Sequence, residues 1–371
     1  MTQRQDFRNL TRRDFIRDTA AAATMAGLAT SLNVSTAGAA NDAVVRKTRS
    51  YNPDMEYRRA GKTNMWVSAV CLGGHWKRVD RVVPGVFGGG GWLSAKLDDE
   101  GFRKNRRDVV TRCIERGVNY IDACTMQEVI AYADALRGRR DSMFLGFSWY
   151  QEELRNENFR TTDALLGTLD KGMRQAKLEY VDVWRITMHE QSGRHSEAEV
   201  DAMMAALDKA RQQGKARFTG FSSHDRPHIK SMIETYPDTV QCVCTPYTAK
   251  SKVLPTDSLF EAVQKHDVGI FGIKPFSGTS LFKGTSAPDD PHREEDDKLA
   301  RMAVRYILCN PAITAPIPGL INEHQVDNMA LAVKEDRELS KSEAKELEQA
   351  MDQCWANLTP EYQWLRSWEY V

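Results

Sequence analysis

Short apolar runs alternate with amphipathic segments along most of this chain, from about residue 70 onward. Each apolar run has the length of a buried strand, and the segment after it carries apolar residues three and four positions apart, which is typical of a helix that covers a sheet. Eight such strand–helix units can be counted. Because strands of a parallel sheet are buried on both faces, this order predicts an α/β protein with a single (β/α)8 TIM barrel.

The pattern also sets the expected bounds of the elements. Strands are expected at 70–72, 120–122, 143–147, 181–186, 218–221, 240–244, 268–273 and 313–317. Helices are expected at 100–116, 128–136, 162–175, 196–213, 227–236, 258–266, 297–308 and 323–333.

Three segments lie outside this repeat. Two short strand-like runs joined at 61–64 predict an N-terminal β-hairpin ahead of the first barrel strand. A Gly-rich loop at 85–91 is long enough to cover a site. At the other end, 336–371 is expected to hold an amphipathic helix at 340–354 and an aromatic tail that packs on the barrel or on a partner. The barrel itself is expected to span 55–335.

The first 39 residues have the three parts of an export signal. A twin-arginine pattern at 11–17 (TRRDFIR) is followed by a weakly apolar Ala-rich run at 20–32 and by the small-x-small site at 37–39. The apolar run is too short and too polar for a stable membrane span. We therefore expect 1–39 to be a twin-arginine signal peptide, 40–54 to be a linker, and the twin-arginine export machinery to carry the protein to the periplasm or the cell exterior.

Composition narrows the function classes. Lys plus Arg and Asp plus Glu both number 51, so the chain lacks the basic surplus of a nucleic-acid-binding protein. Seven cysteines are an odd number and fall in strand and helix interiors, which favours buried thiols over a disulfide framework. A small-molecule substrate is the expected ligand.

Asp122 is the first candidate for chemistry. It ends the apolar run of GVNYIDAC and is followed by a polar loop, so it should face the chamber at the C-terminal ends of the barrel strands. The alternative is an Asp that only caps the following helix.

Several other polar residues follow strands and should open on the same face. They are His75, Cys124, Tyr150, His189 and His224. One interpretation makes His189 or Tyr150 the proton donor, and another builds a metal centre from some of His75, Cys124, His189, His224 and Cys244. No tight ligand spacing in the sequence supports the metal.

Seven motifs in order resemble the aldo-keto reductase family over nearly all of 55–333. The first, MEYRRAGKTNMWVSAVCLGG, resembles the opening hairpin and first strand. The others resemble the second and the fourth to eighth strands, and they are GVNYIDAC, EYVDVWRI, GKARFTGFSS, VQCVCTPY, GIKPFSG and ITAPIPG. The resemblance implies carbonyl reduction with a nicotinamide cofactor, in which an acidified Tyr protonates the developing alkoxide.

The resemblance places Asp122 on the family's catalytic Asp, but the other three catalytic positions differ. The Tyr falls on Gln127, the Lys on Ser148 and the His on Thr187. A site without the Lys would leave Asp122 less stabilised, so the resemblance implies a raised pKa and a general acid or base role for this carboxyl.

The cofactor positions of the family are better kept. The resemblance implies that Ser222, Ser223 and Gln241 hold the nicotinamide carboxamide. It also implies that the loop of Lys274, Ser277 and Gly278 meets the pyrophosphate, and that Gly319 and Gln325 lie near the adenosine. No Arg or Lys matches the position that grips a 2′-phosphate, so the preference between NAD and NADP stays open.

These observations together predict an exported aldo-keto-reductase-like oxidoreductase that acts on a carbonyl or alcohol, such as that of a sugar, with a non-standard site. Because free nicotinamide cofactor is not expected outside the cytoplasm, the cofactor should be tightly bound. The alternative is a barrel without hydride transfer that acts as a lyase, a metal-dependent enzyme or a ligand-binding protein.

Overall fold

The computed structural model describes residues 42–89, 91–251 and 256–368. The predicted signal peptide lies outside these residues, so it stays a prediction, as does export. The chain divides into two units, 1–47 and 48–371. In the first unit, residues 42–45 are helical; everything below concerns the second. Within the described residues, no helix is long and apolar enough to cross a membrane.

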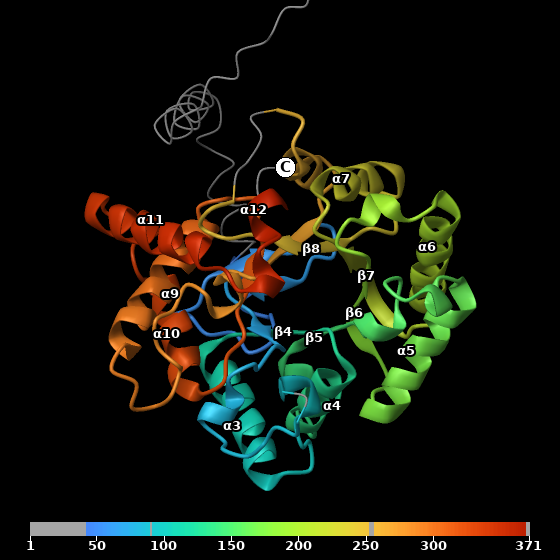
Figure 1. Cartoon of the computed structure of the whole chain (residues 1–371). Helices are drawn as coiled ribbons and strands as arrows, with labels where there is room; N and C mark the ends of the chain where they lie inside the picture. Colours follow the sequence, from blue (N-terminus) through green and yellow to red (C-terminus); the bar gives the residue numbers. More distant parts are fainter. Residues whose placement is uncertain (1–41, 90, 252–255, 369–371) are drawn as a thin grey trace, which may run out of the picture. The chain divides into compact units, whose positions relative to one another are not determined.

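Eight parallel strands form the central barrel, which confirms the predicted fold (Figure 1). Their order in the sheet follows the sequence without interruption. The barrel closes between its first and last strands, where the amide of Gly73 donates to the carbonyl of Pro318 at 2.7 Å. The strands are β3 (Leu72–Gly73), β4 (Tyr120–Ala123), β5 (Phe144–Phe147), β6 (Val181–Thr187), β7 (Ala216–Ser222), β8 (Cys242–Pro246), β9 (Gly269–Ile273) and β10 (Ala315–Ile317).

Helices surround the strands, close to the predicted bounds (Figure 1). They are α3 (Glu100–Arg116), α4 (Met126–Ala135), α5 (Thr162–Ala176), α6 (Glu197–Gln212), α7 (Arg226–Thr235), α8 (Leu259–Lys265), α9 (Arg293–Leu308) and α10 (Glu323–Lys334). Short 3-10 helices are η1 (Val79–Arg81), η2 (Gly91–Ser94), η3 (Arg140–Ser142), η4 (Tyr150–Glu152), η5 (Glu157–Phe159), η6 (Ser192–Arg194), η7 (Ser277–Thr279) and η8 (Pro360–Tyr362). Side-chain capping boxes start α4, α6 and α8 and fix where these helices begin.

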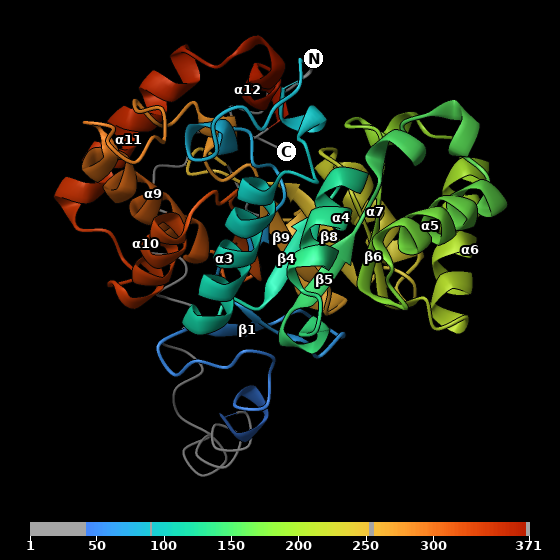
Figure 2. The ribbon, with the colours of Figure 1, turned by 90° about the horizontal axis from the view of Figure 1, so that it is seen from below.

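The predicted hairpin covers one end of the barrel. Strands β1 (Tyr57–Arg59) and β2 (Trp66–Ser68) pair antiparallel, and Gly61 lies against Val268 with a φ of 51°. A Cβ on Gly61 would lie 2.3 Å from the carbonyl oxygen of Asp267, so only glycine fits this approach. Figure 2 shows the hairpin at the end of the barrel opposite to α12 (Leu365–Trp368).

The C-terminal part packs against the barrel's outer helices and then returns to its mouth. Helix α11 (Lys341–Ala356) buries Leu347 and Met351 against Leu299 and Met302 of α9. The chain then turns through η8 to α12, which lies at the C-terminal end of the barrel (Figures 1 and 2). The aromatic tail therefore reaches the face on which barrel proteins carry their sites.

Candidate active site

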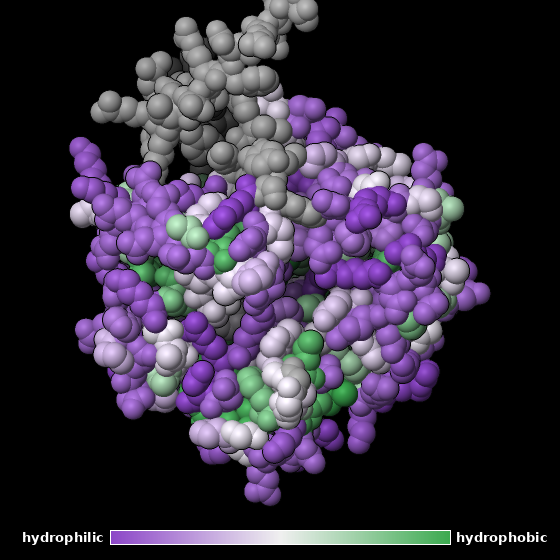
Figure 3. All heavy atoms as spheres, viewed as in Figure 1, coloured by the Kyte–Doolittle hydropathy of each residue, from purple (hydrophilic) through white to green (hydrophobic). Residues whose placement is uncertain are grey.

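A cavity of about 570 Å³ opens at the C-terminal ends of the strands. The space-filling view down this face shows the surface hollowed over the barrel (Figure 3). The loops that follow the strands line the cavity, together with Tyr362 and Trp364 of the tail. Its size suits a small molecule and part of a cofactor.

The floor of the cavity holds a buried ion pair between β4 and β6. Nε and Nη2 of Arg185 donate to the two carboxylate oxygens of Asp122 at 3.0 and 2.9 Å, and Nη1 donates to Oγ of Ser222 at 2.9 Å. Burial alone would lower the pKa of Arg185, but the charge of Asp122 outweighs it and holds this pKa well above its usual value. The expectation that Asp122 lacks a basic partner is therefore wrong, because an arginine from β6 supplies one.

A buried carboxyl next to this pair binds the two residues that stand at the family's Lys and His positions. Glu153 accepts hydrogen bonds from Oγ of Ser148 at 2.6 Å, from the amide of Thr187 at 2.7 Å and from the amide of Trp149 at 3.0 Å. Burial raises the pKa of Glu153 although these donors oppose it. Oγ of Ser222 donates to Oγ1 of Thr187 at 3.2 Å, which joins this network to the ion pair.

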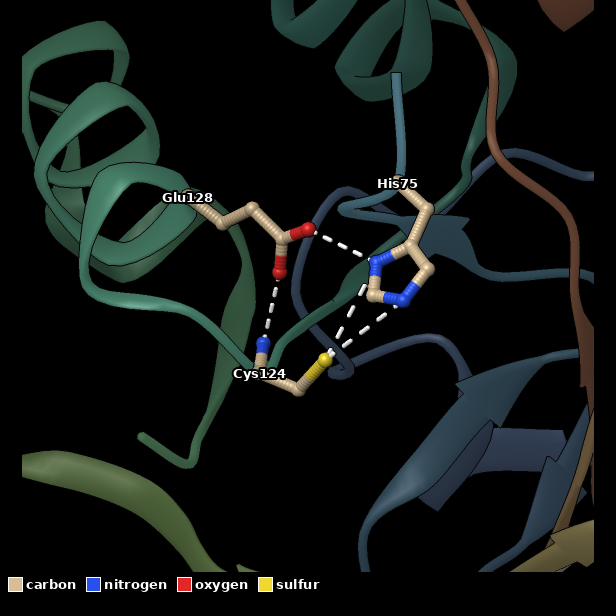
Figure 4. A group of neighbouring side chains, drawn as sticks. All are labelled: His75, Cys124 and Glu128. Carbon is tan, nitrogen blue, oxygen red and sulfur yellow. Dashed lines mark hydrogen bonds and ion pairs between the residues drawn. The ribbon is translucent and has the colours of Figure 1, made fainter. Parts of the chain in front are cut away.

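At the mouth, a histidine, a cysteine and a glutamate come together (Figure 4). Nδ1 of His75, in the loop after β3, lies 2.7 Å from Oε1 of Glu128 in α4. Oε2 of Glu128 accepts from the amides of Cys124 at 2.7 Å and Thr125 at 3.2 Å. The sulfur of Cys124 lies 3.8 Å from both ring nitrogens of His75.

The surroundings of His75 favour its charged form. Burial acts to lower its pKa, but the negative charges of Cys124 and Glu128 and their hydrogen bonds raise the pKa well above its usual value. The side chain stays 38% exposed towards the cavity. Trp92 of η2, which follows the Gly-rich loop, packs on the ring with centroids 4.5 Å apart. His75 is thus a partly exposed group at the cavity whose neighbours favour its charged form.

The predicted proton donors differ in their positions. Tyr150 lines the cavity, and its amide donates to the carbonyl of Cys124 at 3.2 Å. Burial raises the pKa of Tyr150. The ring of His189 is not among the residues that line the cavity, and its Nδ1 accepts from the amide of Gln191 at 3.1 Å. The structure therefore brings Tyr150, and not His189, to the site.

Most of the predicted cofactor residues line the cavity, namely Ser222, Ser223, Lys274, Gly278, Gly319 and Gln325. Two do not. Gln241 precedes β8 at the other end of the strand, where its Oε1 accepts from the amide of Thr219 at 3.1 Å. Ser277 is fully buried behind the cavity wall.

Two lysines give the cavity a positive region. Nζ of Lys77 donates to the hydroxyl of Tyr362 at 2.9 Å, and Nζ of Lys274 lies 5.6 Å from the ring centre of Trp364. Burial lowers the pKa of Lys274, and the two lysines lower the pKa of Tyr362 against its burial. Within the described part of the chain, neither lysine forms a salt bridge with a carboxylate.

The metal centre considered from the sequence is only partly assembled. His75 and Cys124 meet, but His189 and Cys244 are not among the lining residues. The ring of His224 instead stacks on Trp364 with centroids 4.2 Å apart. Burial, followed by the charge of Lys274, lowers the pKa of His224 well below its usual value, so this ring is neutral.

Sequence reasoning missed Arg185, Glu128 and Glu153. Arg185 stands in the buried run VDVWRIT, and a charged residue in such a run needs a buried partner, which was a usable signal. Glu128 stands three residues after Thr125 and could have been recognised as part of a capping box. Glu153 follows a strand with no pattern that marks it.

The closed parallel barrel, with its polar cavity at the C-terminal ends of the strands, defines the class of (β/α)8 proteins. The sequence model of the aldo/keto reductase family matches residues 87–352, well over half of the chain. This protein belongs to the aldo/keto reductase family.

Solved structures of aldo-keto reductases share the fold at low identity. The holo form of aldo-keto reductase AKR11C1 from Bacillus halodurans is 17% identical, with a TM-score of 0.56 over 83% of this chain and 99% of that one. The Klebsiella pneumoniae aldo/keto reductase in complex with NADP and acetate is 16% identical, with a TM-score of 0.57 over 80% and 95%. The thermostable aldo-keto reductase Tm1743, in complex with epalrestat, is 20% identical, with a TM-score of 0.56 over 80% and 100%.

Proposed function

We propose that this protein is an oxidoreductase that uses a nicotinamide dinucleotide on a carbonyl or alcohol, with a site built differently from the tetrad that its family resemblance implies. The observation that carries this proposal is the pair of lysines, Lys77 and Lys274, that line the cavity and have no carboxylate partner among the described residues. Partly buried cations of this kind attract an anion, and a pyrophosphate supplies one.

The residues present fit the anionic part of such a cofactor. Lys77, Lys274 and Gly278 line the cavity, and both Lys77 and Gly278 lie against Tyr362. Gly278 has a φ of 75°. When bound, the dinucleotide would supply or accept the hydride. The hydroxyl of Ser222 donates to Thr187 and accepts from Arg185, and that of Ser223 donates to Ser192 and accepts from the amide of Asp225. Each keeps one lone pair for a further contact.

A reduced carbonyl also needs a proton at its oxygen. His75 carries a proton at neutral pH because its pKa is raised, and it can release that proton to the cavity. Tyr150 has a pKa raised by burial, so its hydroxyl stays protonated and donates a hydrogen bond rather than a proton. We assign proton transfer to His75 and orientation of the substrate oxygen to Tyr150. Asp122 compensates the charge of Arg185 on the floor.

Two further considerations support a retained cofactor. The Klebsiella relative is a complex with NADP, and an exported enzyme would have to keep its cofactor through each cycle. The predicted twin-arginine signal supports our proposal of a periplasmic or extracellular location, and that location supports a tightly held NAD or NADP.

The test begins with mature protein purified from its native host. Denaturation should release a nicotinamide dinucleotide, which absorbance and mass spectrometry would identify. If the protein comes without one, titration with NADH and NADPH should show binding by fluorescence. Because Lys274 would make a charge-assisted contact, Lys274→Met should weaken this binding by about 10- to 100-fold.

Lys283→Met provides the matched control, because Lys283 pairs with Glu295 outside the cavity lining. It should bind the cofactor as the unchanged protein does. If no dinucleotide is released and neither form binds, the proposal is wrong, and a barrel that works without hydride transfer takes its place.

A further inference from the structure

Cys124 lies at the cavity next to the start of a helix and in contact with His75. It directly precedes Thr125, the N-cap of α4, and so lies at the positive end of a ten-residue helix. It lines the cavity and is partly exposed to it. The other cysteine with an exposed side chain among the described residues, Cys309, follows α9 and lines no part of the cavity.

Glu128 fixes how His75 faces this sulfur. One carboxylate oxygen holds the backbone of Cys124 and Thr125, and the other accepts from Nδ1 of His75 (Figure 4). A hydrogen on Nδ1 leaves Nε2 as the nitrogen that exchanges protons with the cavity. Nucleophile, base and orienting carboxylate are therefore in contact, with the looser spacing common before a substrate binds.

Further charged groups interact with Cys124 from the elements around it. Arg185 of β6 and Lys274 after β9 add positive charge, although Asp122 neutralises Arg185. Tyr150 of η4 and Cys244 of β8 are uncharged at neutral pH because burial raises the pKa of each. Glu128 offsets the charge of His75, so Lys274 is the group that adds net positive charge near the sulfur.

We propose that Cys124 is a nucleophile that captures aldehydes covalently, with His75 as its acid–base partner and Glu128 as the residue that positions His75. The thiolate sulfur forms a bond to the carbonyl carbon, and the electron pair of the C=O π bond moves to oxygen. Protonated His75 gives its Nε2 proton to that oxygen. The product is a thiohemiacetal, no electrons are lost or gained overall, and the reverse steps release the aldehyde.

The chemistry selects aldehydes over ketones, because a ketone carbon carries a second carbon substituent that disfavours the crowded tetrahedral adduct. The proposal that Cys124 captures aldehydes does not depend on the proposed function, because the addition of a thiol needs no cofactor. If the proposed function holds as well, the adduct would have to release its aldehyde before a hydride could add, because the carbon of the thiohemiacetal is already saturated.

A metal ion is the competing use of the same three residues. The separation of 3.8 Å between sulfur and nitrogen would accommodate one. Both oxygens of Glu128, however, already accept hydrogen bonds from backbone amides and from His75, so a metal ion would compete with the contacts that orient Cys124 and His75. The geometry therefore favours the nucleophile.

The test uses the full mature protein and competition between an aldehyde and iodoacetamide. Peptide mass spectrometry would follow alkylation of Cys124, with Cys309 in the same sample as the reference thiol. At neutral pH Cys124 should react about tenfold faster than Cys309, and the pH midpoint of its reaction should lie below that of an ordinary thiol. Butanal should protect Cys124 but not Cys309, whereas 2-butanone at the same concentration should protect neither.

Variants distinguish the roles of His75, Glu128 and Cys124. His75→Gln and Glu128→Gln should each move the pH midpoint of Cys124 alkylation upward and reduce protection by butanal. Cys309→Ser should change neither. With aldehyde labelled by ¹³C at the carbonyl, NMR should show a new signal from a tetrahedral carbon in the unchanged protein and not in Cys124→Ser.

Three results would overturn the proposal. Cys124 could react no faster than Cys309, butanal could fail to protect it, or the purified protein could contain a stoichiometric metal that Cys124→Ser loses. The last result would assign the residues to a metal site. None of these outcomes depends on whether a dinucleotide binds.

Discussion

The floor and the mouth of the cavity differ in how deeply their charged groups are buried and how closely these groups are paired. On the floor, Asp122 and Arg185 are almost fully buried and satisfy each other through two hydrogen bonds. At the mouth, His75 is 38% exposed and Cys124 approaches it only to 3.8 Å. A buried, mutually compensated pair holds structure and sets the local field, whereas a partly exposed and loosely coupled pair can exchange protons.

Under the proposed function, Asp122 is paired with Arg185 of β6 and serves the structure, and proton transfer belongs to His75 in the loop after β3. Changes on the floor should therefore reduce stability, and changes at the mouth should reduce activity.

The largest expected effect is on turnover and comes from the mouth. His75→Gln removes the proton donor but keeps a polar side chain, so kcat for aldehyde reduction should fall by about 10²- to 10⁴-fold. Its unfolding midpoint in urea should hardly change. His292→Gln, a change at an exposed histidine outside the cavity lining, should leave kcat as it is. An unchanged kcat in His75→Gln would move proton transfer to Tyr150.

The second-largest expected effect is on stability and comes from breaking the buried ion pair on the floor. Arg185→Met leaves the carboxylate of Asp122 buried without its cation, which should lower the free energy of unfolding by about 3–5 kcal/mol in urea titrations. The double variant Asp122→Asn with Arg185→Met removes both charges and should recover part of this loss. Lys104→Met breaks an exposed ion pair with Asp108, which water screens, so it should cost far less stability than Arg185→Met. Equal losses in Arg185→Met and Lys104→Met would contradict a structural floor.

Glu153 should give a smaller and pH-dependent loss. Glu153→Gln replaces an acceptor that faces the amide of Trp149 with a donor, so it should cost about 1–3 kcal/mol. The pKa of Glu153 is raised by burial, so its favourable contribution is complete below its ordinary value near 4.5 and declines as pH rises through the folded-state pKa. The difference in unfolding free energy between the unchanged protein and Glu153→Gln should thus be largest in acid. Glu157→Gln, at an exposed position, should unfold with the same free energy as the unchanged protein.

The sequence predicted the fold better than the site, for physical reasons. Helix α3 has its expected bounds because its capping Asp99 and its αL Gly117 are local signals. Asp122 and Tyr150 could be placed at the cavity because strand ends in a barrel share one face. Long-range partners carry no local signal: the pair of Asp122 and Arg185 joins residues 63 positions apart.

The same limit explains the placement of His189 and Gln241. Both lie near strand ends in the sequence, and only the registry between β7 and β8 and the local turn after β6 decide which way they face. His75 and Cys124 were recognised as candidates, but their partner Glu128 was not, because its capping role was overlooked. Its contact with His75 spans 53 residues and could not be predicted locally.

The smallest expected effect is on the pH dependence of stability, which should differ between the floor and the mouth. The pKa of His75 is raised, so the stabilising contact with Glu128 is fully present below the ordinary value of 6.5 and is lost as pH rises through the folded-state pKa. Water screens this partly exposed pair, so the difference in unfolding free energy between the unchanged protein and His75→Gln should fall by no more than about 1 kcal/mol. Arg185 keeps its proton over the same alkaline range, so the difference to Arg185→Met should stay constant. A difference that also stays constant for His75→Gln would mean that the contact between His75 and Glu128 does not depend on pH. The mouth would then not differ from the floor in this respect.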